Sequence, residues 1–356
     1  MTPRVVHLAS GREWRGGQRQ VWLLARELAR LNVPQIVVTG HAGELAHRIG
    51  HHGIPLRTVP WTAGLDPRVL PGLVAELRRA PALIHAHDAH AVTLGGVAAA
   101  LTGRPLLATR RVDFHLRRRG YWGRAARIIA ISGAVARVLT EDGIAPERIH
   151  VVHSGIVVEE VRGTPPLGIR ARLGLPREAL IAATVAALVA HKDLAALVRA
   201  AALLRDTLPS LHWVVAGEGV ERRALERLRA ELGLDHRVHL LGHLDDPARL
   251  IADADCFVMS SREEGLGTSV LDAMALGIPV ASTTAGGLPE MLQEGAGLLV
   301  PPGDPAALAA AVERLLREPA LARDIARKAE QRVESFTAAR MAEAVRSVYR
   351  SLVPFP

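Results

Sequence analysis

The residues from Met259 to Val280 combine carboxylates, glycines and a helix start at a spacing that suits a diphosphate. An apolar run typical of a buried strand ends at Met259, and two carboxylates, Glu263 and Glu264, follow among glycines. A helical pattern begins near Thr268. Glycines let the backbone approach a ligand, and the free N–H groups of a helix start, together with the helix dipole, favour an anion. We predict a diphosphate site here; an ordinary capped helix start is the alternative.

Four further features of the second half fit the same ligand. Asp272 falls in the second turn of the predicted helix, leans back toward its N-terminus and can reach a ribose hydroxyl. Lys192 stands just past the predicted strand 181–187, where an ammonium group meets phosphate charge. Two glycine turns, Gly217–Gly219 and Gly286–Gly287, each follow a further predicted strand. The loops of this half therefore converge on one anionic ligand.

The first predicted strand is also followed by a glycine-rich turn, which contains Gly16, Gly17 and Gln18. This turn can bring backbone N–H groups near a phosphate at the helix start. It departs from G-x-G-x-x-G, and the second strand ends without a ribose-binding carboxylate, which argues against a dinucleotide site. It also lacks the lysine of a phosphate-binding loop ATPase. Two glycines that simply close a tight turn are the plain alternative.

The segment 85–90 reads H-A-H-D-A-H and invites a metal interpretation. On a strand, His85 and His87 would share a face, and Asp88 would begin the next loop. No fourth ligand follows from the spacing, and zinc sites usually show a second pair of ligands. We expect instead a strand end that delivers a polar side chain to a cleft, and we predict no metal site.

Residues 110–127 contain seven arginines interleaved with Phe114, Tyr121 and Trp122. They belong to residues 1–160, which hold 21 Arg and no Lys against 12 acidic residues, whereas the rest of the chain has 23 basic and 24 acidic residues. Arginines with aromatics suit an anionic membrane surface or a phosphate-bearing acceptor, and a nucleic-acid groove uses the same types. A solvated basic helix face is the plain alternative. We favour the membrane or acceptor, because the arginines cluster beside a strand-end loop.

Composition and periodicity predict the elements that must position these residues. Hydrophobic residues make up 49% of the 356 residues and charged residues 22%, which indicates a globular chain large enough for two domains. One cysteine, Cys256, excludes a disulfide framework and fits a reducing cytoplasm. Because no apolar run is long enough to span a membrane and no signal core follows the N-terminus, we expect a soluble, cytoplasmic protein.

Short apolar runs alternate with helical patterns, and the series restarts after a Pro- and Gly-containing stretch, 159–166. Such alternation predicts parallel sheets covered by helices on both faces. We expect two doubly wound α/β domains, residues 1–160 and 161–335, that face each other across a cleft. Residues 336–356 are expected to form a final helix that returns to the first domain.

Taken together, these motifs resemble those of a family 4 glycosyltransferase of the GT-B fold, and the resemblance covers nearly the whole chain. G-G-Q at 16–18, A-L-I-H-A-H-D-A-H and R-I-I-A-I-S resemble the N-terminal half of that family. V-V-A-G-E-G and H-L-L-G-H-L resemble its C-terminal half, and the loop with Glu264 and Asp272 resembles its E-x7-E signature. The resemblance implies a retaining, metal-independent transfer of a sugar from a UDP- or GDP-linked donor to a glycan or lipid-linked acceptor of the cell envelope, at the inner face of the membrane.

The resemblance also implies roles for particular residues. Glu264, Lys192 and His115 are expected at the reacting sugar or the departing diphosphate, although Asp113 rivals His115. The remaining expected donor contacts are Glu263, Gly265, Leu266, Gly267, Thr268, Ser269, Asp272, Gly217, Gly219 and Leu241. The expected loop toward the acceptor or diphosphate comprises Gly16, Gly17, Gln18 and Asp113.

Two departures from the family pattern concern the donor site. Asp272 replaces a glutamate and is one methylene shorter, and Ala187 stands where an arginine would face the diphosphate. His191 and Arg262 are the nearest candidates by sequence to replace that arginine. A nucleotide-sugar 2-epimerase of the same architecture, a non-catalytic binding protein and a nucleic-acid-binding protein remain as alternatives. Donor turnover without an acceptor would single out the epimerase.

Overall fold

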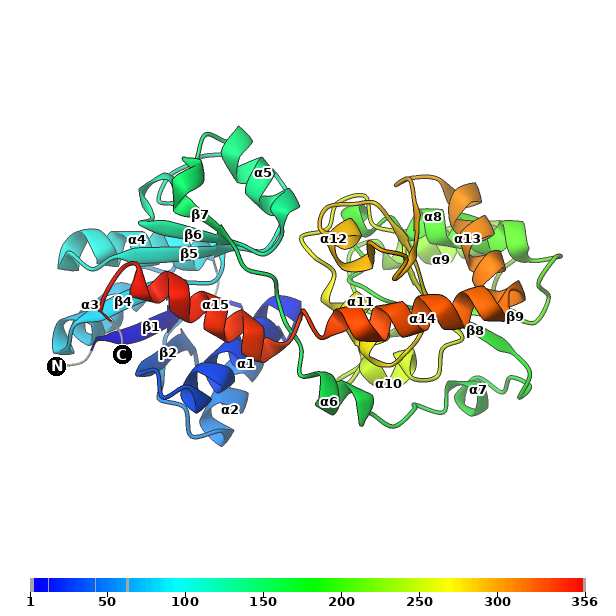
Figure 1. Ribbon diagram of the computed structural model, residues 1–356, viewed down its shortest axis with the longest axis horizontal. Coiled ribbons are helices and arrows are strands. Elements are labelled where there is room, and N and C mark those ends of the chain that lie inside the picture. Colours follow the sequence, from blue (N-terminus) through cyan, green and yellow to red (C-terminus); the bar gives the residue numbers. More distant parts are fainter. Residues whose placement is uncertain (1–2, 12, 42, 62–63, 355–356) are drawn as a thin grey trace. The chain divides into compact units, whose positions relative to one another are not determined.

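The computed structural model describes residues 3–11, 13–41, 43–61 and 64–354 (Figure 1). The chain divides into two compact units: Ile156–Phe336 forms the second, and the residues before and after it form the first. The first boundary therefore lies at Gly155 rather than at residue 160, and part of the predicted linker forms the short helix Val158–Arg162 (α6). Each unit is built around its own parallel sheet.

The first unit contains a seven-stranded sheet in the order β3-β2-β1-β4-β5-β6-β7, with all paired strands parallel. Its strands are Arg4–Leu8 (β1), Gln35–Gly40 (β2), Leu56–Val59 (β3), Ala82–Ala86 (β4), Leu106–Arg110 (β5), Arg127–Ala130 (β6) and Ile149–Val151 (β7). The strand order reverses between β1 and β4, which is where a doubly wound sheet opens a crevice at the carboxyl ends of its strands.

Six α-helices of the described residues accompany this sheet. They are Gly16–Arg30 (α1), Glu44–His51 (α2), Val69–Arg79 (α3), Ala89–Thr102 (α4), Gly133–Glu141 (α5) and Ala338–Arg350 (α15). The Asp88, Ser132 and Thr337 side chains cap α4, α5 and α15 by accepting a backbone N–H of the first turn. The last helix, drawn in red, packs beside α1 (Figure 1). The chain thus completes its first unit with its C-terminal residues.

The second unit repeats the architecture with six strands in the order β10-β9-β8-β11-β12-β13. The strands are Leu180–Val185 (β8), Leu211–Ala216 (β9), Val238–Gly242 (β10), Cys256–Met259 (β11), Val280–Thr283 (β12) and Leu298–Val300 (β13). Its further helices are Ile169–Arg172 (α7), Leu194–Leu204 (α8), Arg222–Glu231 (α9), Ala248–Ile251 (α10), Thr268–Ala275 (α11), Leu288–Leu292 (α12), Pro305–Arg317 (α13) and Pro319–Val333 (α14). Here the order reverses between β8 and β11.

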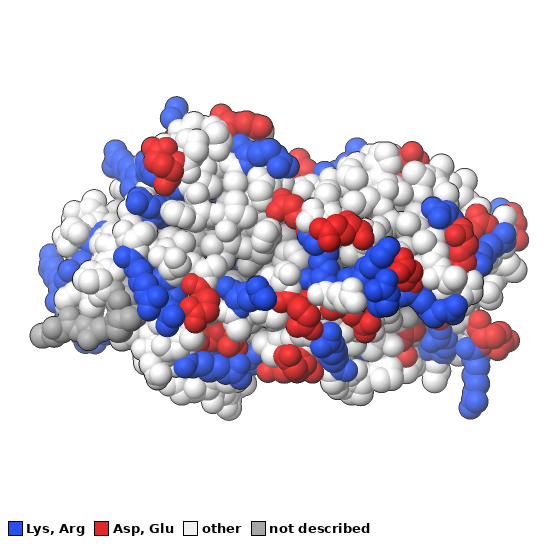
Figure 2. All heavy atoms as spheres, in the orientation of Figure 1, with Lys and Arg blue, Asp and Glu red and all other residues white. Residues whose placement is uncertain are grey.

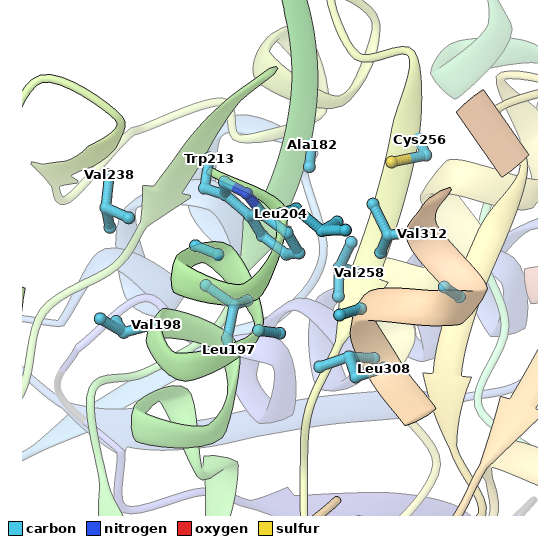
Figure 3. Close-up of a cluster of buried hydrophobic side chains, with 14 of the residues drawn as sticks. Ala182, Leu197, Val198, Leu204, Trp213, Val238, Cys256, Val258, Leu308 and Val312 are labelled. Atoms are coloured by element: carbon cyan, nitrogen blue, oxygen red, sulfur yellow. The ribbon is translucent and has the colours of Figure 1, made fainter. Parts of the chain in front are cut away.

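Figure 3 shows how apolar side chains fix this second sheet. Trp213 on β9 and Val258 on β11 pack against Leu197 of α8 and Leu308 of α13, and all four are buried (Figure 3). Strands buried on both faces read as continuous apolar runs, which explains why the sequence pattern locates them. The one cysteine, Cys256, is buried in the same core, and burial raises the pKa of its thiol.

No helix in the described ranges is both long enough and apolar enough to cross a bilayer. On the face drawn in Figure 2, basic and acidic side chains are interspersed over much of the surface. The basic excess of the first half therefore does not form a single uninterrupted sheet of charge on that face.

Candidate active site

The strongest sequence signal lies where β11 passes into α11 in the second unit. Gly267, the residue before the helix, has φ +90°, a conformation that favours glycine, and a Cβ there would lie 2.8 Å from Leu288 Cδ2. No side chain of the described residues caps this helix start. Ser269 Oγ donates to the Val185 carbonyl at 3.1 Å and ties α11 to the end of β8. The first turn of α11 is thus held in place, and the residue before it supplies no side-chain cap.

Glu264 is the point at which three loops of this unit meet. Its carboxylate pairs with the Lys192 ammonium and accepts a hydrogen bond from Ser261 Oγ at 3.3 Å. Its backbone carbonyl accepts from the Gly287 N–H at 3.0 Å. The carboxylate is only 10% exposed and the lysine side chain 16%. These loops follow β8, β11 and β12, so the predicted carboxylate, lysine and glycine pair lie together as the sequence suggests.

Hydroxyl groups fix the same loops to one another. Ser260 Oγ donates to the Lys192 carbonyl at 2.9 Å, and Thr283 Oγ1 donates to the Ser261 carbonyl at 2.6 Å. Both hydroxyl-bearing residues are buried. Because side chains bond here to the backbone of neighbouring loops, Lys192 and Glu264 are positioned before any ligand arrives.

The second carboxylate of the pattern, Asp272, is buried on α11 with 2% of its surface exposed. Glu263 is exposed instead, and its N–H donates to the His191 carbonyl at 3.4 Å. Gly265, Leu266 and Gly267 are buried, whereas Thr268 and Ser269 are partly exposed. The exposed part of the predicted donor loop is therefore the helix start and Glu263.

The G-E-G turn after β9 packs directly on the loop after β8. Gly217 has φ +146°, and a Cβ there would lie 1.9 Å from the Ala186 carbonyl oxygen. At Gly219 the corresponding distance to the Leu188 carbonyl oxygen is 2.2 Å. Leu188 N–H donates to the Glu218 carbonyl at 3.0 Å and closes the contact. Both glycines are required by this close approach. Leu241, on the neighbouring strand β10, is partly buried.

Ala187, which stands where the family pattern has an arginine that would face the diphosphate, lies in this packed loop. Of the two candidates to replace it, Arg262 is engaged elsewhere: its Nε donates to Asp193 Oδ2 at 2.6 Å, beside the N-terminus of α8. His191 belongs to the same turn as Lys192, and its carbonyl accepts from the Arg262 N–H at 2.8 Å. Lys192 is therefore the cation that this unit brings to Glu264.

In the first unit, Gly16 and Gly17 open α1, and Gln18 follows them. His115 lies on an exposed loop, where its Nδ1 is 2.8 Å from Asp142 Oδ1, and this hydrogen bond raises the pKa of the imidazole. Asp142 also accepts from the Leu116 N–H at 2.7 Å. The structure thus pins His115 to the end of α5. Asp113 is partly buried in the same loop.

His85 of β4 and His87, just after that strand, form a buried cluster with His7 of β1. His7, His85 and His87 bring three ring nitrogens within 4.8 Å of one another. His7 Nδ1 lies 2.9 Å from His87 Nε2, and the two nitrogens of His85 lie 2.7 Å from Tyr349 Oη and Thr109 Oγ1. Burial lowers the pKa of all three imidazoles, that of His7 to about 3. The arrangement works as a hydrogen-bonded network that joins α15 to the sheet.

Two family models cover most of the chain. Residues 168–332 match the model of glycosyl transferases group 1, and residues 14–160 match that of glycosyltransferase family 4. A D-inositol 3-phosphate glycosyltransferase of Catenulispora acidiphila is 30% identical over 82% of this chain and 78% of its own length. The chain belongs to glycosyltransferase family 4. Among further family 4 relatives, the lipopolysaccharide core biosynthesis glycosyltransferase LpsE of Rhizobium meliloti is 33% identical over 52% of each chain.

The first curated relatives are only partly covered: this family 4 chain spans little more than half the length of each. Among solved structures, Anabaena Alr3699/HepE in complex with UDP-glucose superposes with a TM-score of 0.87, covering 98% of this chain and 100% of that one at 21% identity. The fold of this family 4 member is therefore the GT-B fold, with two Rossmann-like domains, as the sequence predicts.

Proposed function

We propose that this protein is a retaining, metal-independent glycosyltransferase that moves a sugar from a nucleotide-sugar donor to a glycan or lipid-linked acceptor. The observation that carries the proposal is the meeting of Lys192, Glu264 and the uncapped start of α11 at one edge of the second sheet. A helix start and an ammonium group together suit a diphosphate. The carboxylate beside them suits the hydroxyl groups of the attached sugar.

The proposed chemistry is stabilisation of a leaving group. When the bond between the sugar and the diphosphate breaks, negative charge grows on the diphosphate, and fixed donors aimed at it lower the barrier. The N–H groups of Thr268 and Ser269 and the ammonium of Lys192 are the donors in question. Because the Glu264 contact and the Ser260 hydroxyl hold Lys192 in place, little reorganisation is needed when charge develops. Each such donor contributes about 3 kcal/mol in comparable sites.

Metal independence rests on the same balance of charge. A metal ion in a phosphoryl or glycosyl transferase neutralises the developing charge and is held by carboxylates. Here the Glu264 carboxylate is already paired with an ammonium group, and the helix start supplies a second positive field. Full activity in the presence of EDTA is therefore expected, and dependence on an added divalent cation would contradict this part of the proposal.

The donor and acceptor are proposed from the relatives together with the site. The structure of HepE contains UDP-glucose, so UDP is the first nucleotide to test here, with GDP as the alternative. The name of LpsE points to the lipopolysaccharide core, and we propose an envelope glycan or its lipid-linked precursor as acceptor. We also propose that exposed arginines of the segment 110–127, Arg117–Arg119 among them, bring the enzyme to the anionic inner face of the membrane.

A donor screen and one conservative variant test the enzymatic proposal. The melting temperature of the protein is measured with UDP, GDP, ADP and their sugars; a ligand at 100 times its Kd stabilises by about 2.7 kcal/mol. Turnover of the stabilising donor is then compared in wild type and Glu264→Gln, which is nearly isosteric but loses the charge. We expect retained nucleotide binding and a loss of turnover of about 100-fold or more. Unchanged turnover would contradict the assigned role of Glu264.

The membrane proposal has its own test. Vesicles with and without anionic lipid are sedimented with wild type and with a variant in which Arg117, Arg118 and Arg119 are replaced by Gln. Each arginine near an anionic surface contributes about 1 kcal/mol, so the triple variant should bind more than tenfold more weakly. Arg137→Gln, on an exposed position of α5, is the matched control. Equal binding of all three proteins would remove the membrane from the proposal.

A further inference from the structure

The first unit contains a pocket of about 190 Å³ at the carboxyl ends of β1, β4 and β5. Gly17 and Gln18 of α1 line it on one side, and Arg110, Arg111 and Trp122 line it on another. A water molecule needs about 10–15 Å³ of such space, so the pocket is large enough for a charged group with part of a sugar attached. It lies at the reversal point of the first sheet, where ligands of doubly wound sheets bind.

Two guanidinium groups of this pocket lack a carboxylate partner. Within the described part of the chain, neither Arg110 nor Arg111 forms a direct ion pair, and the Nε of each is buried without a hydrogen-bond partner. Asp142 and Asp113 act on Arg110 only at longer range, and their effect on its pKa is smaller than that of burial. Arg110 donates to the Phe114 carbonyl at 2.6 Å and lies over the Trp122 ring at 5.4 Å. Burial lowers the pKa of both, that of Arg111 to about 10. Since burying an unpaired charge costs free energy, an anion bound here would recover part of that cost.

The start of α1 adds a positive field to the same pocket. The helix runs from Gly16 to Arg30, and its first turn has no acidic residue and no side-chain cap among the described residues. A Cβ at Gly17 would lie 3.7 Å from Arg111 Cδ, so the N-terminal turn and Arg111 are close neighbours. Helix dipole and guanidinium therefore act on one volume.

The carboxylate that lines the pocket does not neutralise these charges by direct pairing. Asp88 accepts hydrogen bonds from Ser10 Oγ, from Ser10 N–H at 2.7 Å and from Ala91 N–H at 2.9 Å. These bonds cap α4 and fix the turn after β1, so the carboxylate is engaged in structure. It offsets Arg111 only at longer range, and burial outweighs its effect on the pKa of that arginine.

The buried histidine pair behind the pocket orients Arg111. The Arg111 guanidinium lies 3.4 Å from His87 Nδ1, and His87 Nε2 lies 2.9 Å from His7 Nδ1. Because a guanidinium only donates, Nδ1 of His87 accepts and its proton sits on Nε2, which donates to His7. Burial keeps both rings neutral by lowering their pKa. The chain of bonds thus directs the Arg111 side chain without adding a competing charge.

We propose that this pocket binds an oxyanion of the acceptor, a phosphate or carboxylate group, through Arg111 and Arg110 and the start of α1. The assignment of that group to the acceptor rests on the proposed glycosyltransferase function. The same oxyanion chemistry is present in the diphosphate of the donor, and the experiment separates these two sources. Arg111 is a binding and specificity residue on this proposal, and an uncharged acceptor would lose its main anchor.

The test measures inorganic phosphate binding by calorimetry in wild type, Arg111→Gln and the control Arg137→Gln, first without and then with saturating UDP. Loss of a charge-assisted hydrogen bond should weaken phosphate binding about tenfold or more in Arg111→Gln. The control should bind as wild type does. UDP should bind equally to all three proteins, and with the donor site filled by UDP the wild type should still bind phosphate. Phosphate binding under saturating UDP that is unaltered in Arg111→Gln, or that is absent from the wild type, would overturn the proposal.

A second variant guards against a folding defect. If Arg111→Gln also fails to bind UDP, Arg111→Lys decides, because it keeps the charge and loses the fork of donors. Weaker phosphate binding with normal UDP binding in Arg111→Lys supports the proposal, and unchanged phosphate binding overturns it. The wild type could bind phosphate yet show neither stabilisation by UDP nor turnover of any nucleotide sugar. That result would contradict the proposed function but would still support an anion site in this pocket.

Discussion

Replacement of Gly217 by alanine adds a single methyl group, yet we expect it to disrupt the proposed donor site. The new Cβ would lie 1.9 Å from the Ala186 carbonyl oxygen, more than 1 Å inside an ordinary contact of about 3.5 Å. The φ of +146° adds backbone strain of about 1–3 kcal/mol for any residue with a Cβ. The loop at 186–188 must retreat and lose its 3.0 Å hydrogen bond between Leu188 and Glu218, worth about 1 kcal/mol.

These terms predict a loss of about 3–5 kcal/mol in the free energy of unfolding. A unit of this size loses about 2–4 °C of melting temperature per kcal/mol, so a shift on the order of 10 °C is expected. The matched control is Gly174→Ala, in the same unit with φ +64°, where a Cβ would meet no described atom within 4 Å. It should cost about 1–2 kcal/mol, the ordinary penalty for a left-handed alanine.

Urea unfolding and UDP binding together check this prediction. The free energies of unfolding of the two variants should differ by about 1–4 kcal/mol at equal denaturant slopes, because both residues have positive φ and only Gly217→Ala creates an overlap. Gly174→Ala should keep the stabilisation by UDP, and Gly217→Ala should lose most of it. Equal stabilities for the two variants would refute the reasoning from the close approach. If Gly217→Ala binds UDP as well as the wild type does, the G-E-G turn takes no part in the proposed donor site.

Three other outcomes are expected. Glu264→Gln and Lys192→Met should each lower the free energy of unfolding, because each leaves one member of a largely buried ion pair without its partner. The double variant should lose about 0.5–3 kcal/mol less than the sum of the two single losses, measured by urea unfolding. Strict additivity of the two losses would contradict this coupling. The pKa of His115 is raised in the folded state, so the stability gained from its hydrogen bond with Asp142 is full below the unfolded pKa of about 6.5. That stability disappears as the pH rises through the folded pKa. Asp142→Asn should lower the pKa of His115 in an NMR titration, and an unmoved pKa would disprove the assigned cause. Burial lowers the pKa of His7 to about 3, so the folded state resists protonation of this ring and stability falls as the pH drops from about 6.5 toward 3. In urea unfolding between pH 7 and 4, His7→Asn should lose less free energy of unfolding than the wild type does.

The sequence predicts the second unit well because its strands are buried on both faces. Apolar runs such as 256–259 and 213–216 have no polar alternation to obscure them, and each lies within an observed strand. The strand Ile149–Val151 cannot be recognised in this way, because it has three residues, contains a histidine and lies partly exposed at the edge of its sheet. Periodicity gives too little signal for an edge strand of that length.

The candidate site of the second unit could be predicted because its residues come from loops that follow recognisable strands. Glu264, Lys192 and Gly287 lie at successive strand ends, and the parallel sheet brings those ends to one edge. The same rule places His115 in the loop after β5, but the residues of this segment that line the pocket are Thr109 to Val112, at the end of the strand and just after it. In the sequence, Arg111 is one of seven arginines in the segment 110–127, and nothing in the pattern distinguishes it from the others. Its role depends on which arginines are buried, and spacing does not report burial.

Local sequence patterns cannot predict contacts between residues that lie far apart in the chain. His85 and Tyr349 are separated by 264 positions, yet their side chains are 2.7 Å apart. Nothing in either local pattern specifies the other residue, because the pairing follows from the packing of α15 beside α1. The absence of an arginine at Ala187 is visible in the sequence, whereas the pairing of Arg262 with Asp193 is visible only in the structure.

The two sheets carry polar clusters at equivalent reversal points, and the charges in them are balanced differently. In the second unit the cation has its partner: Lys192 is paired with Glu264 before any donor binds. In the first unit Arg110 and Arg111 form no direct ion pair among the described residues, and carboxylates act on them only at longer range. A paired cation is fixed in position and stabilises charge that develops during reaction, whereas an unpaired, buried cation gains most from a ligand that brings charge with it. The first arrangement suits catalysis on a donor whose charge changes, and the second suits recognition of an acceptor whose charge is constant.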